Sequence, residues 1–334
     1  MRISMYCAFR RVLPMAFMLA AGSSMAAESA ASADLDVNGG LPPSSETSVV
    51  EVQPQDVEMQ TPSVQEFYSY LQEAIDDEDW WSAIDFGEIV LYNFPESPFS
   101  QEIPFLLGMS YFRLNQYELA NTALSEYLKK SASPKHFEDA IEMKFAIAEF
   151  FRSGGKKRLF GSHKLPAILP AREDALKIYD EVITTLPHHD IAIRSLLGKA
   201  EIQVEFEDFK PGVETLQTLI HRFPKHDLAA EAYLQINKIY LKQCQALHLD
   251  PNLLDLAEVN LQKFRLAFPR EPRLETAAAA LREMNELYAK NLLETGQFFQ
   301  KRKQNEASKI YYSKVIAKYP DTEAAAVARE KLDK

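Results

Sequence analysis

Apolar residues recur every three to four positions along most of the chain, and this spacing predicts amphipathic helices. The pattern ends the same way several times, with a small residue twelve positions before a proline and a leucine or aromatic residue directly before that proline. Four stretches follow this rule, namely 83–95, 175–187, 212–224 and 257–269. Looser copies span 120–134, and 307–320 with Ala307 as the small residue. Because proline disfavours helix in the residue before it, each copy predicts a helix end.

The prolines that close these copies are separated by 37 to 53 residues. Repetition at such a period is typical of helical solenoids, in which each repeat buries its apolar face against its neighbours. We therefore predict an all-α, right-handed superhelical solenoid over residues 62–332, with about six helix pairs, about twelve helices in all and no strands. A cap helix follows Pro320, and Asp321 or Thr322 is its predicted N-cap.

The amino-terminal 61 residues have a different composition. Residues 1–26 are typical of a secretory signal peptide, with Arg10 and Arg11 before an apolar stretch and a cleavage site between Ala26 and Ala27. Residues 27–61 are rich in serine, alanine, proline and acids, which predicts a disordered acidic tether. The apolar stretch is followed by Ser23 rather than cysteine, so no lipid anchor is indicated. We expect a periplasmic protein that reaches the membrane only through partners.

Charge is distributed unevenly along the chain. Residues 12–112 contain 17 Asp and Glu and no Lys or Arg, whereas residues 113–334 contain 34 Lys and Arg and 31 Asp and Glu. The densest acidic run is 76–79, directly before two tryptophans. This run has two interpretations: a solvated turn in which Asp79 caps the next helix, or a surface that steers a basic partner.

The second interpretation predicts a partner site on the first two helix pairs. A peptide along the first helices of these pairs would contact Tyr68 and Tyr111. Asp76, Asp77 and Asp79 would then form an acidic rim. Neutralising the rim should slow association with a positively charged partner.

A basic insertion interrupts the third helix pair at residues 153–170. It contains three glycines within eight residues and the basic residues Lys156, Lys157, Arg158 and Lys164. Insertions in repeat proteins map to loops on one face, so the segment is either a solvated linker or a contact surface. Its positive charge also suggests that the insertion could fold over the predicted partner site with its acidic rim, as an internal lid. Its glycines and lysines lack the spacing of a phosphate-binding loop, which excludes that kind of nucleotide site.

No combination of residues indicates catalysis, a cofactor or a metal. His188 and His189 follow a repeat-ending proline, where polar turn residues are expected, and they lack the spacing of a helical zinc pair. Cys244 falls on an apolar helical face and is predicted to be a buried small hydrophobe. We therefore predict a protein that is not an enzyme.

Two sets of residues resemble known families. Leu106, Leu107, Gly108, Tyr111, Tyr117, Ala120 and Leu124 match the tetratricopeptide consensus. The strings in residues 94–120, 127–140, 221–240 and 317–328 resemble the BamD/ComL family of outer-membrane assembly proteins. This resemblance implies a periplasmic scaffold at the inner face of the outer membrane that binds barrel-assembly components or unfolded outer-membrane proteins, and not nucleic acid. The same strings fit, less completely, repeat adaptors of envelope constriction, peptidoglycan or secretion machinery.

Overall fold

The protein is described here by a computed structural model that covers residues 62–130, 133–158, 166–246 and 250–333. The chain divides into two compact units, Met1–Met59 and Gln60–Lys334, and all described residues lie in the second unit. The signal peptide predicted at residues 1–26 and the tether predicted at residues 27–61 lie outside the described residues, and so does Lys164.

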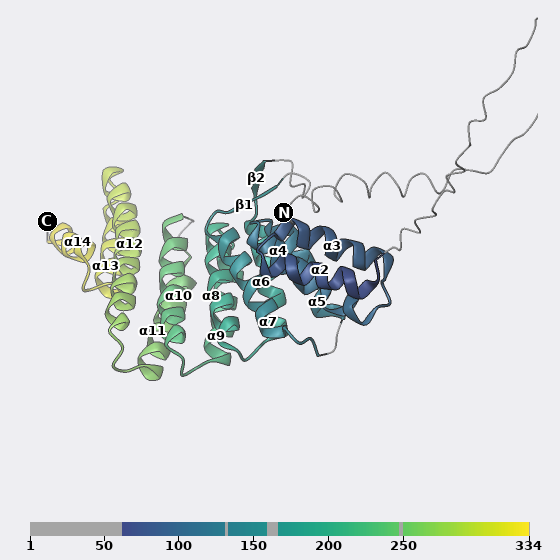
Figure 1. Cartoon of the computed structure of the whole chain (residues 1–334). Helices are drawn as coiled ribbons and strands as arrows, with labels where there is room; N and C mark the ends of the chain where they lie inside the picture. The colour runs from purple at the N-terminus through teal and green to yellow at the C-terminus, as the bar shows by residue number, and fades with distance from the viewer. Residues whose placement is uncertain (1–61, 131–132, 159–165, 247–249, 334) are drawn as a thin grey trace, which may run out of the picture. The chain divides into compact units, whose positions relative to one another are not determined.

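Thirteen α-helices, one 3-10 helix and one two-stranded sheet make up the described part, labelled as in Figure 1. They are α2 (Val64–Asp76), α3 (Trp80–Asn93), η1 (Pro98–Gln101), α4 (Ile103–Arg113), α5 (Tyr117–Lys130), α6 (Phe137–Arg152), β1 (Lys156–Arg158), β2 (Ala167–Pro170), α7 (Arg172–Thr185), α8 (Asp190–Glu205), α9 (Phe209–Arg222), α10 (Asp227–Ala246), α11 (Pro251–Ala267), α12 (Arg273–Lys301), α13 (Asn305–Lys318) and α14 (Glu323–Leu332).

The helices form six consecutive pairs, from α2 and α3 to α12 and α13, and the first helix of each pair also packs on the pair before it (Figure 1). The cap helix α14 packs on α13 and α12. Its N-cap is Thr322, whose Oγ1 accepts a hydrogen bond from the Ala325 amide at 3.2 Å. The predicted all-α solenoid of about six helix pairs with a cap helix is confirmed.

Four joints between pairs and the joint before the cap helix share one backbone conformation. The residue before the proline leaves the helical region, with φ between −127° and −135° and ψ between 53° and 69°, at Phe94, Leu186, Phe223, Phe268 and Tyr319. The small residue of the pattern is buried where its helix meets its neighbours. In α13 this residue is Ser308, which is 3% exposed, rather than the predicted Ala307. Ser308 restores the twelve-residue spacing to Pro320.

The turns inside the pairs also repeat. The second residue after α2, α4, α8 and α12 has a left-handed φ of 55° to 62°, and these residues are Glu78, Asn115, Glu207 and Lys303. Gly154 has the same place after α6, with φ 99°. The insertion therefore leaves the solenoid at the turn of the third pair. Glycine suits this site because a left-handed φ costs it little.

The insertion corrects the prediction that the protein has no strands. Strand β1 pairs antiparallel with β2, with Lys156 opposite Pro170 and Lys157 opposite Leu169. Glycines and prolines prevent a helix here, and a short hairpin satisfies the backbone groups of the two strands instead. The chain then enters α7 at Arg172 and continues the regular stack.

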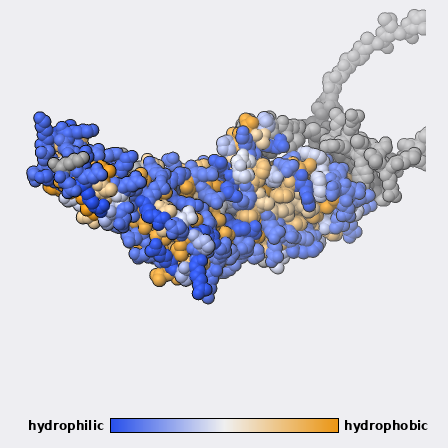
Figure 2. Space-filling model, turned by 90° about the vertical axis from the view of Figure 1, so that its left-hand side faces the viewer, coloured by the Kyte–Doolittle hydropathy of each residue, from blue (hydrophilic) through white to orange (hydrophobic). Residues whose placement is uncertain are grey.

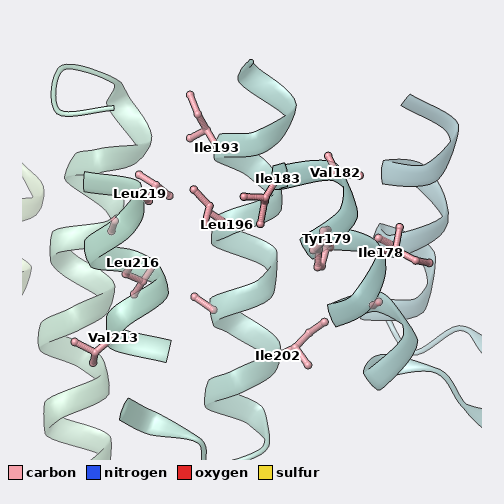
Figure 3. Packing of buried hydrophobic residues seen from close by; sticks show 14 of the residues in the cluster. Ile178, Tyr179, Val182, Ile183, Ile193, Leu196, Ile202, Val213, Leu216 and Leu219 are labelled. Carbon is pink, nitrogen blue, oxygen red and sulfur yellow. The ribbon is translucent and has the colours of Figure 1, made fainter. Parts of the chain in front are cut away.

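The core of the described residues consists of four buried clusters between successive helices, and partly buried residues pack between them. In Figure 3, Ile178, Tyr179, Val182 and Ile183 on α7, Ile193, Leu196 and Ile202 on α8, and Val213, Leu216 and Leu219 on α9 extend into the spaces between these helices. Hydrophilic residues predominate on the face shown in Figure 2, where hydrophobic residues form separate areas. Burial of apolar surface between neighbours is what stabilises a solenoid.

Candidate functional site

The acidic turn between α2 and α3 combines a structural and an exposed part. Asp79 is the N-cap of α3: its Oδ1 accepts a hydrogen bond from the Ser82 amide at 3.2 Å, and its Oδ2 accepts one from Ser82 Oγ at 2.6 Å. The interpretation that Asp79 caps this helix is confirmed. Asp76 and Asp77 are exposed at the end of α2, so both carboxylates face solvent at the beginning of the solenoid.

Tyr68 joins α2 to the start of the second pair. Its ring stacks on Phe99 with ring centroids 4.5 Å apart, and its hydroxyl donates a hydrogen bond to Glu102 Oε2 at 3.0 Å. Partial burial, followed by the hydrogen bond to Glu102, raises the pKa of the Tyr68 hydroxyl. Tyr68 is therefore a neutral donor held in place by contacts within the solenoid.

Glu102 is the centre of this polar group. Its Oε1 accepts a hydrogen bond from Lys135 Nζ at 3.2 Å and lies 3.5 Å from His136 Nε2, directly before α6. Burial acts to raise the pKa of the Glu102 carboxyl, but hydrogen bonds from Lys135 and Tyr68 outweigh it and hold this pKa below its usual value. Glu102 thus connects the first helices of three successive pairs.

Tyr111, the second predicted contact tyrosine, also forms a hydrogen bond within the solenoid. Its hydroxyl donates a hydrogen bond to Glu88 Oε1 on α3 at 2.8 Å. Burial and this carboxylate raise the pKa of the Tyr111 hydroxyl far above its usual value. Tyr68 contacts residues just before α4, whereas Tyr111 lies in the last turn of α4, about 13 Å further along at 1.5 Å per residue. The structure therefore places the two predicted contact tyrosines at opposite ends of α4.

The basic insertion is attached to the middle of the solenoid. Lys157 forms an ion pair with Asp174 on α7, and the backbone amide of Arg158 donates a hydrogen bond to the Glu118 carboxylate on α5. Lys156 is exposed. The lid hypothesis stays a prediction, because residues 159–165 lie outside the described part and the contacts of β1 run to α5 and α7.

Sequence reasoning missed a buried lysine at the junction of α5, α6 and α7. Lys144 is 1% exposed, and its Nζ lies 2.6 Å from Glu181 Oε2, 2.7 Å from Asn121 Oδ1 and 2.5 Å from Ser125 Oγ. Burial lowers the pKa of the Lys144 ammonium, and the Glu181 carboxylate offsets this only in part. Ile141, Ala148 and Phe151 are buried residues of α6 at helical spacing from position 144, so the period of this helix already places Lys144 on the apolar face. What the sequence did not indicate is the set of polar partners on α5 and α7.

A surface groove of about 500 Å³ lies above this lysine. Its lining residues are polar and come from α5 and α7, and they are Asn121, Thr122, Ser125, Glu126, Lys129, Lys130 and Glu181. Both charge signs are present in the groove, so the charges do not favour a cationic ligand or an anionic ligand. We interpret the Lys144–Glu181 pair as a polar joint between repeats rather than a binding site.

The histidines and the cysteine have structural contacts. His189 is the N-cap of α8, where its Nδ1 accepts a hydrogen bond from the Ile191 amide at 3.3 Å. Cys244 is buried, with its Sγ 3.5 Å from the Tyr288 hydroxyl, and burial raises the pKa of its thiol. In the residues that the structure describes, no group of three or more His, Cys, Asp or Glu side chains is placed to hold a metal ion. Among the described helices, none is long and apolar enough to cross a membrane.

Sequence comparison agrees with this architecture. A tetratricopeptide-repeat family profile matches residues 105–133, which cover α4 and most of α5. Residues 105–133 therefore form a tetratricopeptide repeat. A second profile, of the family YfiO described as outer membrane lipoprotein, matches residues 193–332, from α8 to the end of α14. The carboxy-terminal part of the chain, residues 193–332, is therefore similar to the BamD-like proteins of that family. No curated protein sequence matches the chain.

Several solved structures of repeat proteins are similar to the chain. A tetratricopeptide-repeat protein from Parabacteroides merdae is 13% identical, over 81% of this chain and 97% of that one, with a TM-score of 0.34. MamA from Desulfovibrio magneticus is 13% identical, over 63% and 97%, with a TM-score of 0.33. A thermophilic repeat protein of Thermus thermophilus is 12% identical, over 66% and 99%, with a TM-score of 0.30.

Proposed function

We propose that the protein is a non-enzymatic scaffold for the assembly and insertion of outer-membrane β-barrel proteins. The observation that carries this proposal is the outer membrane lipoprotein family match over residues 193–332, which extends over the last three helix pairs and the cap helix. Scaffolding suits a solenoid because stacked repeats expose extended surfaces without needing a cofactor. Its partners in this proposal are barrel-assembly components or unfolded outer-membrane proteins.

The first two helix pairs are the proposed contact region for a positively charged partner. Residues 62–112 contain ten Asp and Glu and no Lys, Arg or His. Asp76 and Asp77 are exposed at the end of α2, and Tyr68 is half-buried about two helical turns before Asp76. A negative surface raises the association rate of a positive partner, and salt weakens this effect because the Debye length is about 8 Å at physiological ionic strength.

Export and attachment complete the proposal. Residues 1–26 would be removed between Ala26 and Ala27, residues 27–61 would tether the solenoid, and attachment to the inner face of the outer membrane would depend on protein partners. Intact-mass measurement of the mature protein tests this. We expect a protein that starts at Ala27 or Glu28 without acyl chains, and a mass increase equal to fatty acyl chains would contradict the proposed mode of attachment.

Affinity capture of the full-length protein from envelope extract tests the function. We expect enrichment of barrel-assembly subunits or unfolded outer-membrane proteins over a capture with empty resin. The variant Asp76→Asn/Asp77→Asn should reduce this enrichment, whereas the matched control Asp255→Asn/Glu258→Gln on α11 should not. Enrichment of constriction or peptidoglycan proteins without barrel-assembly proteins would overturn the proposal in favour of an envelope adaptor.

A further inference from the structure

The outer side of α3 carries an exposed row of aromatic and acidic side chains. Trp81, Asp85, Glu88 and Tyr92 follow the spacing i, i+4, i+7 and i+11, which places all four on one side of the helix. Trp81 is 38% exposed and Tyr92 is 83% exposed, and both acids are exposed as well. We call these four residues the α3 stripe.

The α3 stripe lies opposite the face with which α3 packs. Ala83, Ile84, Gly87 and Val90 are the buried residues of this helix. They join the core formed with α2 and α4. The aromatic residues of the stripe are thus not needed to fill the core. Exposed large aromatic side chains arranged in a row are a common feature of protein-binding surfaces.

The electrostatic surroundings of the α3 stripe are negative. None of the residues from 62 to 112 is a Lys, Arg or His, and ten of them are acidic. Arg113, the next basic residue along the chain, lies over the Trp80 ring at 5.8 Å, and Lys135 donates a hydrogen bond to Glu102 at 3.2 Å. Glu88 Oε1 accepts the hydrogen bond from the Tyr111 hydroxyl at 2.8 Å. The charge of this surface therefore complements a cationic segment.

The order of the four residues specifies the chemistry further. Asp85 lies one helical turn from Trp81, and Glu88 lies one turn from Tyr92, so each carboxylate has an aromatic residue as its neighbour along the helix. A guanidinium or ammonium group contacts a ring face and a carboxylate favourably at the same time. The stripe is about 16 Å long at 1.5 Å per residue, which equals about five residues of an extended peptide.

From this combination we propose that the α3 stripe is a docking site for a lysine- or arginine-rich segment of a protein partner. The proposal relies on the proposed function only in that the partner is a protein, and it does not depend on a role in barrel assembly. It is also separate from the basic insertion of this chain, in which Lys157 is already paired with Asp174.

The test uses the full-length protein and a fluorescein-labelled 12-residue peptide with four arginines separated by serine or glycine. Its control peptide has glutamine in place of each arginine. Fluorescence anisotropy at 50 mM and 300 mM salt should show that the arginine peptide binds, that salt weakens binding, and that the glutamine peptide binds at least about threefold more weakly.

Two double variants locate the site. Asp85→Asn/Glu88→Gln keeps side-chain size and an acceptor for Tyr111, and it should weaken binding of the arginine peptide about three- to tenfold. Trp81→Ala/Tyr92→Ala should weaken it by a similar factor, because the cation–π contacts are lost. Circular dichroism should show unchanged helix content in both variants.

The matched control is Asp255→Asn/Glu258→Gln on α11. This helix is also the second of its pair and also exposes apolar side chains, at Leu256, Val259 and Leu266. We expect the control to bind like the unchanged protein. Equal weakening by the control, equal binding of the glutamine peptide, or no effect of either α3 variant would overturn the α3 docking site. The affinity capture from envelope extract decides the barrel-assembly role separately.

Discussion

Removal of the exposed partner of the Lys144–Glu181 pair should cost more stability than removal of the buried one. Lys144 is 1% exposed, whereas the Glu181 side chain is 48% exposed. In Glu181→Ala the ammonium group stays buried with only Asn121 and Ser125 as acceptors. In Lys144→Met an apolar chain of similar length occupies the site, and the Glu181 carboxylate regains hydration from the surface.

The magnitudes follow from this asymmetry. Loss of one partner from a buried ion pair typically costs about 3–5 kcal/mol, because the other charge stays buried and uncompensated. Since Glu181 is half exposed and water enters its place, we expect about 2–4 kcal/mol for Glu181→Ala. Replacement of a buried charge by an apolar side chain is often neutral, so we expect Lys144→Met to lie within about 1 kcal/mol of the unchanged protein.

Urea unfolding followed by circular dichroism at pH 7 measures both free-energy changes. A second series at higher pH tests the cause. The pKa of Lys144 is lower in the folded protein than its ordinary value of 10.5. Between the folded-state pKa and 10.5 the unfolded chain therefore binds more protons than the folded one, and the free energy of unfolding increases as pH rises through this interval. The deficit of Glu181→Ala should therefore shrink at high pH. The reasoning is refuted if Lys144→Met is the more destabilised variant, or if the deficit of Glu181→Ala grows with pH.

Three further predictions concern packing, capping and acid sensitivity. Gly198→Ala should destabilise the protein by about 1–3 kcal/mol in thermal unfolding, because the added Cβ would lie 2.7 Å from the hydroxyl of buried Tyr179. Gly212→Ala should cost less, because its added Cβ would lie 3.1 Å from the Val204 side chain. An equal cost at both sites would contradict this reasoning. Asp79→Ala should cost about 1 kcal/mol by loss of the α3 cap, whereas Asp76→Asn/Asp77→Asn should slow partner association in stopped-flow measurements without lowering the melting temperature; a lower melting temperature for the double variant would assign these acids a structural role. The Glu102 carboxyl has a lowered folded-state pKa, so its contribution to stability is complete above its ordinary 4.5 and is lost as pH falls through the folded value. Glu102→Gln should accordingly be less stable than the unchanged protein at pH 7, and this difference should disappear on acidification; a difference that persists at low pH would exclude this charge as its source.

Local features of the sequence predicted where the helices of this fold begin and end. The spacing of small residues and prolines predicted the helix ends, because a residue before proline avoids the helical conformation wherever it occurs, as Phe94 and Tyr319 show. The acidic residue before Trp80 predicted a helix cap, and this effect is also local, because the Asp79 carboxylate accepts a hydrogen bond from a backbone amide only three residues away. The single-residue error at Ala307 arose because alanine and Ser308 are both small, and only burial distinguishes them.

The candidate site depended on contacts between residues that are distant in sequence. Tyr68 and Glu102 are 34 residues apart, and Lys144 is 37 residues from Glu181, so no periodic pattern indicates that they meet. The strands of the insertion also form only by pairing with each other. The sequence by itself determined the helices, their order and the excess of acid in the first two pairs, because these depend on neighbouring residues and on composition. Only the tertiary structure decided which tyrosine hydroxyls donate hydrogen bonds to carboxylates, which carboxylate pairs with Lys144 and which side of α3 is exposed, because each depends on how one repeat packs against the next.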